Sequence, residues 1–465
     1  MVGADLLGYN GAKALTYVEE LLESVAQRLR PSPETLEKAK LYAEKLVKSV
    51  EELFGPGTAS VEGSFARGTM VRSREEVDIF IHFKPETPVE RAAEDVLKRG
   101  TELVKNLGGT VRLRYASHPY VEGFLEGLRV NLVPCYDTEY GKWITPVDRT
   151  PYHTRYVKSV LDERMADEVR LLKAFLMNDG LYGAEIRNKG FSGYVCELLI
   201  IRFGSFLQLV RQASGWKPPV VLDGEKPMSP ASAITLLDPV DKTRNAAAAV
   251  SLTTLSKLIM KSKLFLKEPS DSYFLSRTSF KPSVEGRCFL AVVLDVPERP
   301  PDVLWGELTK TLEGLAKALS GYGFKPLRTD RWFEDGKGLL IFELESLSLP
   351  QVYLHTGPPV WSMNAVEFID EQARKQDLAA YPWVEGERLC SLRRRRFTNA
   401  ADFVKHLIDG DLASFSKNLR PFLKKSKIYT NLDEVYSAMS EEGRIFLDDF
   451  VRTCPNFIAQ YHSLG

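Results

Sequence analysis

Two acidic residues in one apolar stretch carry the strongest chemical signal in the chain. They lie in Glu76-Val-Asp-Ile-Phe80. Alternate residues of a strand share one face, so Glu76 and Asp78 would project together while Val77 and Ile79 pack behind them. Neighbouring carboxylates repel each other, and a small set of hard oxygen ligands suits a Mg²⁺ ion that also holds substrate phosphates. The pattern therefore predicts a magnesium site acting on a phosphate-containing substrate; the alternative is a strand edge with two solvated acids.

A glycine-serine turn precedes these acids, in the segment Gly63-Ser-Phe-Ala-Arg-Gly-Thr69. Such a turn offers backbone N–H groups and a hydroxyl, and a short helix beginning there would direct its positive end at an anion. Arg67 adds positive charge beside it. Gly-Ser followed at this spacing by acid-apolar-acid on a strand resembles the DNA polymerase beta-like nucleotidyltransferases.

The elements that must position these residues form an α+β protein of several domains. The chain has 465 residues, which is too long for one ordinary core. Helices are expected over 12–54 with a break at 31–33, near 89–107, from 165 onward, over 194–210 and 246–261, and near 303–320. Strands are expected over 59–64, 77–83, 288–294 and 338–342, with a hairpin-like pair over 111–115 and 128–136.

The amino-acid composition limits the kinds of binding partner and the cell compartment that can be expected. Lys+Arg and Asp+Glu both number 62, so a nucleic-acid surface must arise from local clusters rather than from net charge. The five cysteines are scattered and unpaired in sequence, which favours a reducing cytoplasm over a disulfide framework or a zinc site. A leader sequence and a long apolar run are absent, so membrane association is not expected. The oligomeric state is open, with a homodimer among the options.

Further segments extend the resemblance along the chain. They are Tyr115-Ala-Ser-His-Pro-Tyr-Val121, Val133-Pro-Cys-Tyr136, Asp148-Arg-Thr-Pro-Tyr-His153, Glu168-Val-Arg-Leu-Leu-Lys173, Gly180-Leu-Tyr-Gly-Ala-Glu185, Gly190-Phe-Ser-Gly-Tyr194, Asp238-Pro-Val-Asp-Lys-Thr-Arg-Asn245 and Gly357-Pro-Pro-Val-Trp361. In this order they resemble the archaeal-type (class I) CCA-adding enzymes.

The resemblance implies template-independent addition of C, C and A to the 3′ end of tRNA, with CTP and ATP as substrates and Mg²⁺ as cofactor. It also implies a polymerase-beta-like nucleotidyltransferase head over 1–147, a helical neck over 148–275 that recognises the nucleotide base, and an α+β body and tail over 276–465 that bind tRNA.

The same resemblance implies roles for single residues. Ser64 and Arg67 would hold the triphosphate, and Glu76 and Asp78 would bind Mg²⁺. The nucleotide would also be contacted by His153, Lys173, Tyr182 and Arg244, the last reading the incoming base. A lone histidine or tyrosine is more often structural, and a surface salt bridge is the alternative for Arg244.

The sequence departs from the family pattern at residue 131. A third carboxylate is expected there, on a neighbouring strand, as a catalytic residue and metal ligand; this chain has Val130-Asn-Leu-Val133. Asn131 offers a neutral carbonyl oxygen but no charge and no base. An experimental Asp→Asn change, a natural variant using another nearby acid or water, and a non-catalytic tRNA-binding relative all explain it. A smaller departure is Ser117, where the family pattern has Glu.

Basic residues concentrate in two places that fit a phosphate track. One is Arg393, Arg394, Arg395 and Arg396, and the other includes Lys424 and Lys425. Double-stranded RNA is bound largely through shape and backbone, so such clusters can grip every tRNA acceptor arm. A solvated basic face is the alternative for each.

Other functions stay in competition at this point. A poly(A) polymerase or an oligoadenylate synthetase would share the acidic pair and the glycine-serine turn. An inactive tRNA-binding relative would explain Asn131. The segments 148–153 and 357–361 favour the CCA-adding reading.

Overall fold

The computed structural model describes residues 9–72, 74–114, 119–275, 283–334 and 336–464. Ser117 and the segment around it lie outside these ranges. The chain divides into two compact units: the first combines residues 1–280, 300–302 and 454–465, and the second combines 281–299 and 303–453. Residues 454–465 thus return to the first unit after the second is complete.

The elements of the first unit follow in chain order. They are α1 (Tyr9–Leu29), α2 (Pro33–Phe54), β1 (Ala59–Glu62), α3 (Gly63–Ala66), β2 (Glu76–Phe83), α4 (Val89–Asp95), a π-helical turn (Val96–Gly100), α5 (Thr101–Asn106), β3 (Thr110–Arg114), β4 (Tyr120–Leu125), β5 (Leu128–Tyr136), a 3₁₀ turn (Pro146–Arg149), α6 (Thr150–Val160), α7 (Glu163–Met177), α8 (Gly193–Phe203), α9 (Phe206–Ala213), β6 (Val220–Val221), β7 (Ile234–Thr235), α10 (Leu252–Lys267), α11 (Ser272–Leu275) and α18 (Asn456–Leu464).

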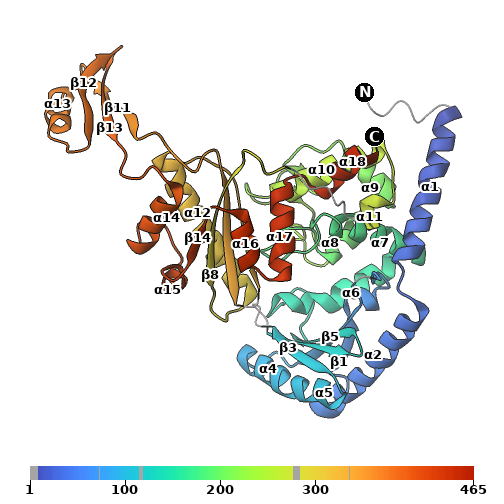
Figure 1. Cartoon of the computed structure of the whole chain (residues 1–465). Helices are drawn as coiled ribbons and strands as arrows, with labels where there is room; N and C mark the ends of the chain where they lie inside the picture. Colours follow the sequence, from blue (N-terminus) through green and yellow to red (C-terminus); the bar gives the residue numbers. More distant parts are fainter. Residues whose placement is uncertain (1–8, 73, 115–118, 276–282, 335, 465) are drawn as a thin grey trace. The chain divides into compact units, whose positions relative to one another are not determined.

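A five-stranded sheet with the order β1-β2-β5-β4-β3 organises the amino-terminal part. Figure 1 labels β1, β3 and β5 of this sheet. The expected alternation in β2 is confirmed: Val77, Ile79 and Ile81 are fully buried in the core that the sheet shares with α2, the π-helical turn and α5. Glu76 and Asp78 therefore lie on the opposite face of the sheet.

The predicted hairpin between 111–115 and 128–136 is wrong, because β4 lies between these strands and pairs with both. The sequence signal of β4 is weak, since Glu122 and Gly123 interrupt its apolar run. Gly123 has a packing reason: a Cβ there would lie 2.8 Å from Cγ1 of Val104. The turn at Glu126-Gly127 has positive φ angles of 47° and 84°, as in tight β-hairpins.

The helical part of the first unit packs around an aromatic cluster that includes Phe175, Phe206 and Phe265. One helix was expected over 194–210, but α8 ends at Phe203. Gly204 there takes a left-handed conformation (φ 79°), and the side chain of Ser205 caps α9. Phe457 of α18 is buried in the same core.

A buried ion pair ties α18 to the helical core. Lys261 Nζ donates to Asp179 Oδ2 at 2.5 Å and to the carbonyl oxygen of Tyr273 at 2.9 Å. The second carboxylate oxygen of Asp179 accepts from the backbone N–H of Phe457 at 3.0 Å. Burial lowers the pKa of Lys261 to about 8, so the ammonium form still predominates at pH 7.

Replacing Asp179 by alanine is expected to lower the free energy of unfolding by about 3–5 kcal/mol, because a buried lysine charge loses its partner. Chemical denaturation measures the change. Asp271→Ala is the matched control: it breaks the exposed pair with Arg28, whose side chains are 47% and 55% accessible, and should cost less than about 1 kcal/mol. Equal effects of the two substitutions would contradict the prediction.

The second unit contains two sheets. Its elements are β8 (Cys288–Asp295), α12 (Pro301–Tyr322), β9 (Pro326–Glu334), β10 (Lys337–Leu344), β11 (Val352–Pro359), α13 (Ala365–Ala373), β12 (Leu378–Glu385), β13 (Arg388–Arg394), α14 (Ala400–Asp409), α15 (Arg420–Leu423), β14 (Lys427–Tyr429), α16 (Leu432–Ala438) and α17 (Glu441–Arg452). The predicted strands 288–294 and 338–342 are confirmed as β8 and β10 of the sheet β14-β8-β10-β9. Helices α12 and α14 cover one face of this sheet, and α16 and α17 cover the other. The smaller sheet β11-β13-β12 packs with α13 and was not expected.

The cysteines and the apolar helices bear on two further expectations. All five cysteines lie in the described ranges and are free. Among the described residues, no single helix is long and apolar enough to cross a membrane. Helices α8 and α9 are long and apolar enough only when taken together, and they are bent by 92° relative to each other.

Candidate active site

A row of polar residues crosses the sheet at one level, on the face opposite the apolar core. Pairing between neighbouring strands joins Glu62 of β1 to Asp78 of β2, Asp78 to Asn131 of β5, and Asn131 to Glu122 of β4. Directly paired residues project to the same face, so the four side chains form one line. The structure thus brings Asp78 and Asn131 together, as the sequence predicted, and adds a glutamate on either side.

The glycine-serine turn and the acidic strand touch at Gly63. Its φ angle is +73°, which favours glycine, and a Cβ built there would overlap Oδ2 of Asp78. Ser64 follows at the start of α3 with its side chain partly exposed. The absence of a side chain at residue 63 therefore lets the carboxylate of Asp78 lie directly against the turn.

Asn131 binds Asp78 through its amide nitrogen. Nδ2 donates to Oδ1 of Asp78 at 2.7 Å. Within the described part of the chain, the buried Oδ1 of Asn131 has no hydrogen-bond partner. Burial raises the pKa of Asp78, while the hydrogen bond from Asn131 and the charge of Arg67 oppose that rise. An oxygen ligand at residue 131 is thus available to a cation.

Glu76 is paired with Arg129, the residue opposite it on β5. Arg129 also lies 3.7 Å from Oε1 of Glu122. The guanidinium of Arg129 thus partly neutralises the carboxylate of Glu76. With the side chains as they stand, the described residues contain no group of three His, Cys, Asp or Glu arranged as a metal site, so binding an ion requires side-chain movement.

The donors nevertheless fit a hard divalent cation. Glu76 and Asp78 would supply carboxylate oxygens, and Asn131 would supply a buried carbonyl oxygen that has no hydrogen-bond partner among the described residues. Few protein oxygens, with room for water and substrate phosphates, are what Mg²⁺ requires. A zinc site of nitrogen and sulfur ligands does not fit these donors.

Two residues that were expected to touch the triphosphate brace the turn from the helical side. Arg67 Nε lies 2.8 Å from Oε2 of Glu197, and Thr69 Oγ1 donates to Oε1 of Glu197 at 2.5 Å. Lys173 Nζ donates to both the carbonyl oxygen and the hydroxyl of Thr69 at 3.0 Å. Burial alone would raise the pKa of Glu197, but Arg67 and Lys173 bring it below its ordinary value. Arg67 and Lys173 therefore fix the turn to α7 and α8.

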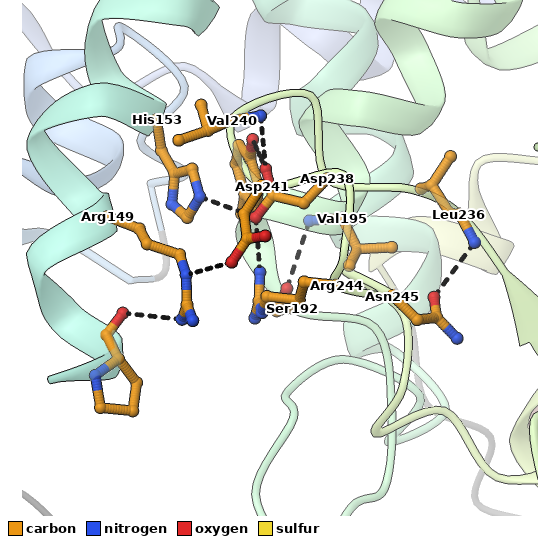
Figure 2. A network of polar contacts seen from close by, with 12 residues as sticks. Arg149, His153, Ser192, Val195, Leu236, Asp238, Val240, Asp241, Arg244 and Asn245 are labelled. Carbon is orange, nitrogen blue, oxygen red and sulfur yellow. Dashed lines mark hydrogen bonds and ion pairs between the residues drawn. The ribbon is translucent and has the colours of Figure 1, made fainter. Parts of the chain in front are cut away.

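A second network surrounds Asp238 (Figure 2). His153 Nε2 and Arg244 Nη1 lie 2.9 and 2.8 Å from Oδ2 of Asp238, and the hydroxyl of Tyr194 donates to Oδ1 at 2.9 Å. The rings of His153 and Tyr194 stack with centroids 3.9 Å apart. Burial alone would raise the pKa of Asp238, but the hydrogen bond and the charge of His153 bring it below its ordinary value. Burial lowers the pKa of His153.

The loop that carries Asp238 is fixed at several points, as Figure 2 shows. Arg149 Nε donates to Asp241 Oδ2 at 3.0 Å, and the side-chain oxygen of Asn245 accepts from the backbone N–H of Leu236 at 3.1 Å. The segments 148–153, 190–194 and 238–245, far apart in sequence, thus form one assembly. Within it the Arg244 side chain is 39% accessible, so part of its guanidinium faces solvent.

Tyr182 adjoins that assembly: it forms a β-bridge with Phe191, and a Cβ on Gly193 would lie 2.8 Å from its hydroxyl. The guanidinium of Arg74 lies over its ring, 5.2 Å from the centroid. Burial raises the pKa of Tyr182, so its hydroxyl keeps its proton and can act as a hydrogen-bond donor near neutral pH.

The arginine run 393–396, which begins at the end of β13, is not uniformly exposed. Arg393 pairs with Asp377 at 2.5 Å, and Arg395 is half-buried over the ring of Tyr353. Arg394 and Arg396 are exposed. Lys424 and Lys425 are exposed as well. Within the run, therefore, Arg394 and Arg396 are the residues whose charge is most accessible to a polyanion.

Sequence reasoning missed Glu62, Glu197 and Asp238 as site residues. For Glu197 a signal exists: it is a single charge inside the apolar run Val195-Cys-Glu-Leu-Leu-Ile-Ile201, and buried acids need partners. Asp238 was quoted within a motif without a role. Glu62 precedes the glycine-serine turn, and the sequence does not show that it pairs with Asp78.

Three family models match the chain in succession. They are a nucleotidyltransferase domain over residues 43–163, the second domain of tRNA nucleotidyltransferase over 167–275, and the C-terminal domain of CCA-adding enzyme over 285–431.

Several full-length relatives are described as CCA-adding enzymes. The one from Sulfurisphaera tokodaii is 36% identical over 379 residues, which cover 81% of this chain and 89% of the relative. The one from Methanothermobacter thermautotrophicus is 32% identical over 450 residues, covering 92% and 97%. The one from Pyrobaculum neutrophilum is 35% identical over 405 residues, covering 86% and 96%.

Proposed function

The chain belongs to the CCA-adding enzymes, and from this premise we propose that the face carrying Glu76 and Asp78 is where nucleotides are joined to the 3′ end of tRNA. The reaction is template-independent addition of C, C and A from CTP and ATP. The observation that supports this location is the contact of Asp78 with Gly63, which puts an acid directly against the turn expected to hold phosphates.

The enzyme works with divalent metal ions, and we assign Mg²⁺ to Glu76, Asp78 and the carbonyl oxygen of Asn131. When bound, such an ion withdraws electron density from the phosphoryl oxygens and acidifies the attacking 3′-hydroxyl. The carboxylates of Glu76 and Asp78 hold that charge in place. Arg129 pairs with Oε2 of Glu76, so Oε1 is the oxygen of Glu76 that would bind the ion while the pair persists.

Head and neck residues together would orient the nucleotide. Ser64 offers a partly exposed hydroxyl at the start of α3, and Arg67 and Lys173 keep the turn rigid through Thr69 and Glu197. Tyr182 can add a hydroxyl donor.

Arg244 would read the base, since its fork of donors suits an acceptor edge and part of it stays accessible. His153 would help to position Arg244, because both side chains contact Oδ2 of Asp238.

The division of labour follows the three expected domains. Residues 1–147 would form the catalytic head and 148–275 the neck. Residues 276–465 would contribute most of the tRNA-binding body and tail; within them, 454–465 join the first unit. Exposed basic side chains of the second unit, including Arg394, Arg396, Lys424 and Lys425, are the proposed phosphate contacts.

The function is tested by incubating the protein with tRNA lacking its CCA end, Mg²⁺, and labelled CTP and ATP. Addition of C, C and A followed by a stop is the expected result. Continued addition of A would instead indicate a poly(A) polymerase. Binding of tRNA without any addition, even at high enzyme concentration and long times, would indicate an inactive relative.

Replacing Arg394 and Arg396 together by alanine should weaken tRNA binding and reduce the slope of log affinity against log salt by about 1–2, because fewer counterions are released. Filter binding at several salt concentrations measures the slope. Arg393→Ala is the matched control, since Arg393 is already paired with Asp377. An unchanged slope in the double variant would assign these two arginines to a solvated face.

A further inference from the structure

The proposed cation site of Glu76, Asp78 and Asn131 is short of negative charge. Asn131 is neutral, and Glu76 is paired with Arg129. Of these three residues, only Asp78 carries a carboxylate that is not in a salt bridge among the described residues. Its single negative charge does not balance the two positive charges of a divalent cation. Another buried acid facing Asp78 would correct the deficit.

Glu62 has this position. It ends β1, it is 4% accessible, and it pairs in register with Asp78, so both side chains lie on one face. Its charge is near enough to Asp78 to raise the pKa of that carboxyl.

One oxygen of Glu62 is held and the other is not. Ser60 Oγ donates to Oε1 of Glu62 at 2.8 Å and also lies 2.8 Å from Nε2 of His82. Because the serine proton points to Glu62, the histidine nitrogen is the donor to Ser60. Oε2 of Glu62 is buried and has no hydrogen-bond partner among the described residues. A buried carboxylate oxygen without a partner is costly, and a cation is a ligand that would satisfy it.

We infer that Glu62 is a fourth protein ligand of the divalent site, supplying through Oε2 the carboxylate charge that residue 131 lacks. This inference rests on the proposed function of the face. Ser60 is its positioning residue, since its bond to Oε1 fixes the carboxylate with Oε2 left for the cation.

Glu122, on the opposite flank of the row, is the competing acid. It pairs in register with Asn131, but Arg129 lies 3.7 Å from its carboxylate and partly neutralises it, as Arg129 also does for Glu76.

Glu62 cannot take over the catalytic role of a base at residue 131. Strand β2 separates the two, and neighbouring strands lie about 4.8 Å apart, so Glu62 sits roughly 10 Å from Asn131 across the row. Glu62 can therefore supply charge to the ion without replacing a base at residue 131.

The test measures binding of Mn²⁺, which takes the same oxygen ligands as Mg²⁺, to the whole protein without nucleotide by electron paramagnetic resonance. Glu62→Gln should weaken Mn²⁺ binding about 10- to 100-fold, a loss typical of removing a group that supports a metal site. Ser60→Ala should weaken it less, and Glu122→Gln should leave it nearly unchanged. Asn131→Asp should strengthen binding and reduce the effect of Glu62→Gln.

Folding and the proposed function are controlled separately. The melting temperature of metal-free Glu62→Gln should equal or exceed that of the parent, because a buried charge beside Asp78 is removed. Asp78→Ala tests the face itself: if it leaves Mn²⁺ affinity unchanged, the proposed function of the face is wrong. If Asp78→Ala abolishes binding but Glu62→Gln has no effect, or has less effect than Glu122→Gln, the inference about Glu62 alone is overturned.

Discussion

Replacing Asp78 by alanine should lower the rate of nucleotide transfer by at least about 10³-fold, since the loss of several kcal/mol of stabilisation from the cation is felt at the transition state. Asp78 lies at the centre of the row, in contact with the turn at Gly63 and with Asn131. Glu76→Ala should act in the same direction. Single-turnover addition of labelled CTP to tRNA lacking its CCA end measures the effect.

The affinity of these variants for tRNA should stay nearly unchanged, because the exposed basic residues proposed to bind RNA lie in the second unit. Filter binding at the same salt concentration provides this control. A large loss of tRNA binding in Asp78→Ala would contradict the separation of catalysis from RNA binding. A rate within about tenfold of the parent would remove Asp78 from the catalytic residues.

Replacing Asn131 by aspartate should raise the rate of C and A addition by about 10²-fold or more, the lower end of what a positioned proton acceptor contributes. The amide of Asn131 cannot accept the proton of the attacking hydroxyl, and Glu62 lies on the other side of Asp78. Nucleotide affinity should change little, so the gain should appear in the transfer step under saturating substrate and Mg²⁺.

Asn131→Asp should also destabilise the metal-free protein, and this effect provides a control for the substitution. In the parent, Nδ2 of Asn131 donates to Asp78 at 2.7 Å; an aspartate would place two carboxylates at that distance. The metal-free melting temperature should therefore fall, and divalent ions should restore it. If Asn131→Asp is no faster at saturating Mg²⁺, residue 131 is not the third catalytic position.

The fold was predictable where the sequence pattern is local. Alternation identified β2, and the proline pair at 31–33 placed the break between α1 and α2. Strand β4 was missed because its residues serve two different surfaces: Glu122 faces the polar row, and Gly123 admits Val104. The small sheet with α13 was also missed.

The candidate site was predictable as a set of residues but not as a set of contacts. Spacing along one strand is enough to put Glu76 and Asp78 on one face. The register between β1, β2 and β5 depends on the whole sheet, so the pairing of Glu62 with Asp78 could not be read from sequence. Likewise, Glu197 becomes the partner of Arg67 and Lys173 only when α8 packs beside the turn.

The return of residues 454–464 to the first unit affects the order in which the protein can be completed during translation. Residues 281–453 must be synthesised before Phe457 can enter the core and donate its N–H to Asp179. At about 5–20 residues per second this interval lasts on the order of ten seconds or more. During that time Phe457 is missing from the hydrophobic core of the nascent catalytic unit, and the second unit becomes complete only when the interval ends. A chaperone that protects the nascent chain would therefore be needed most by the part of the enzyme that was made first.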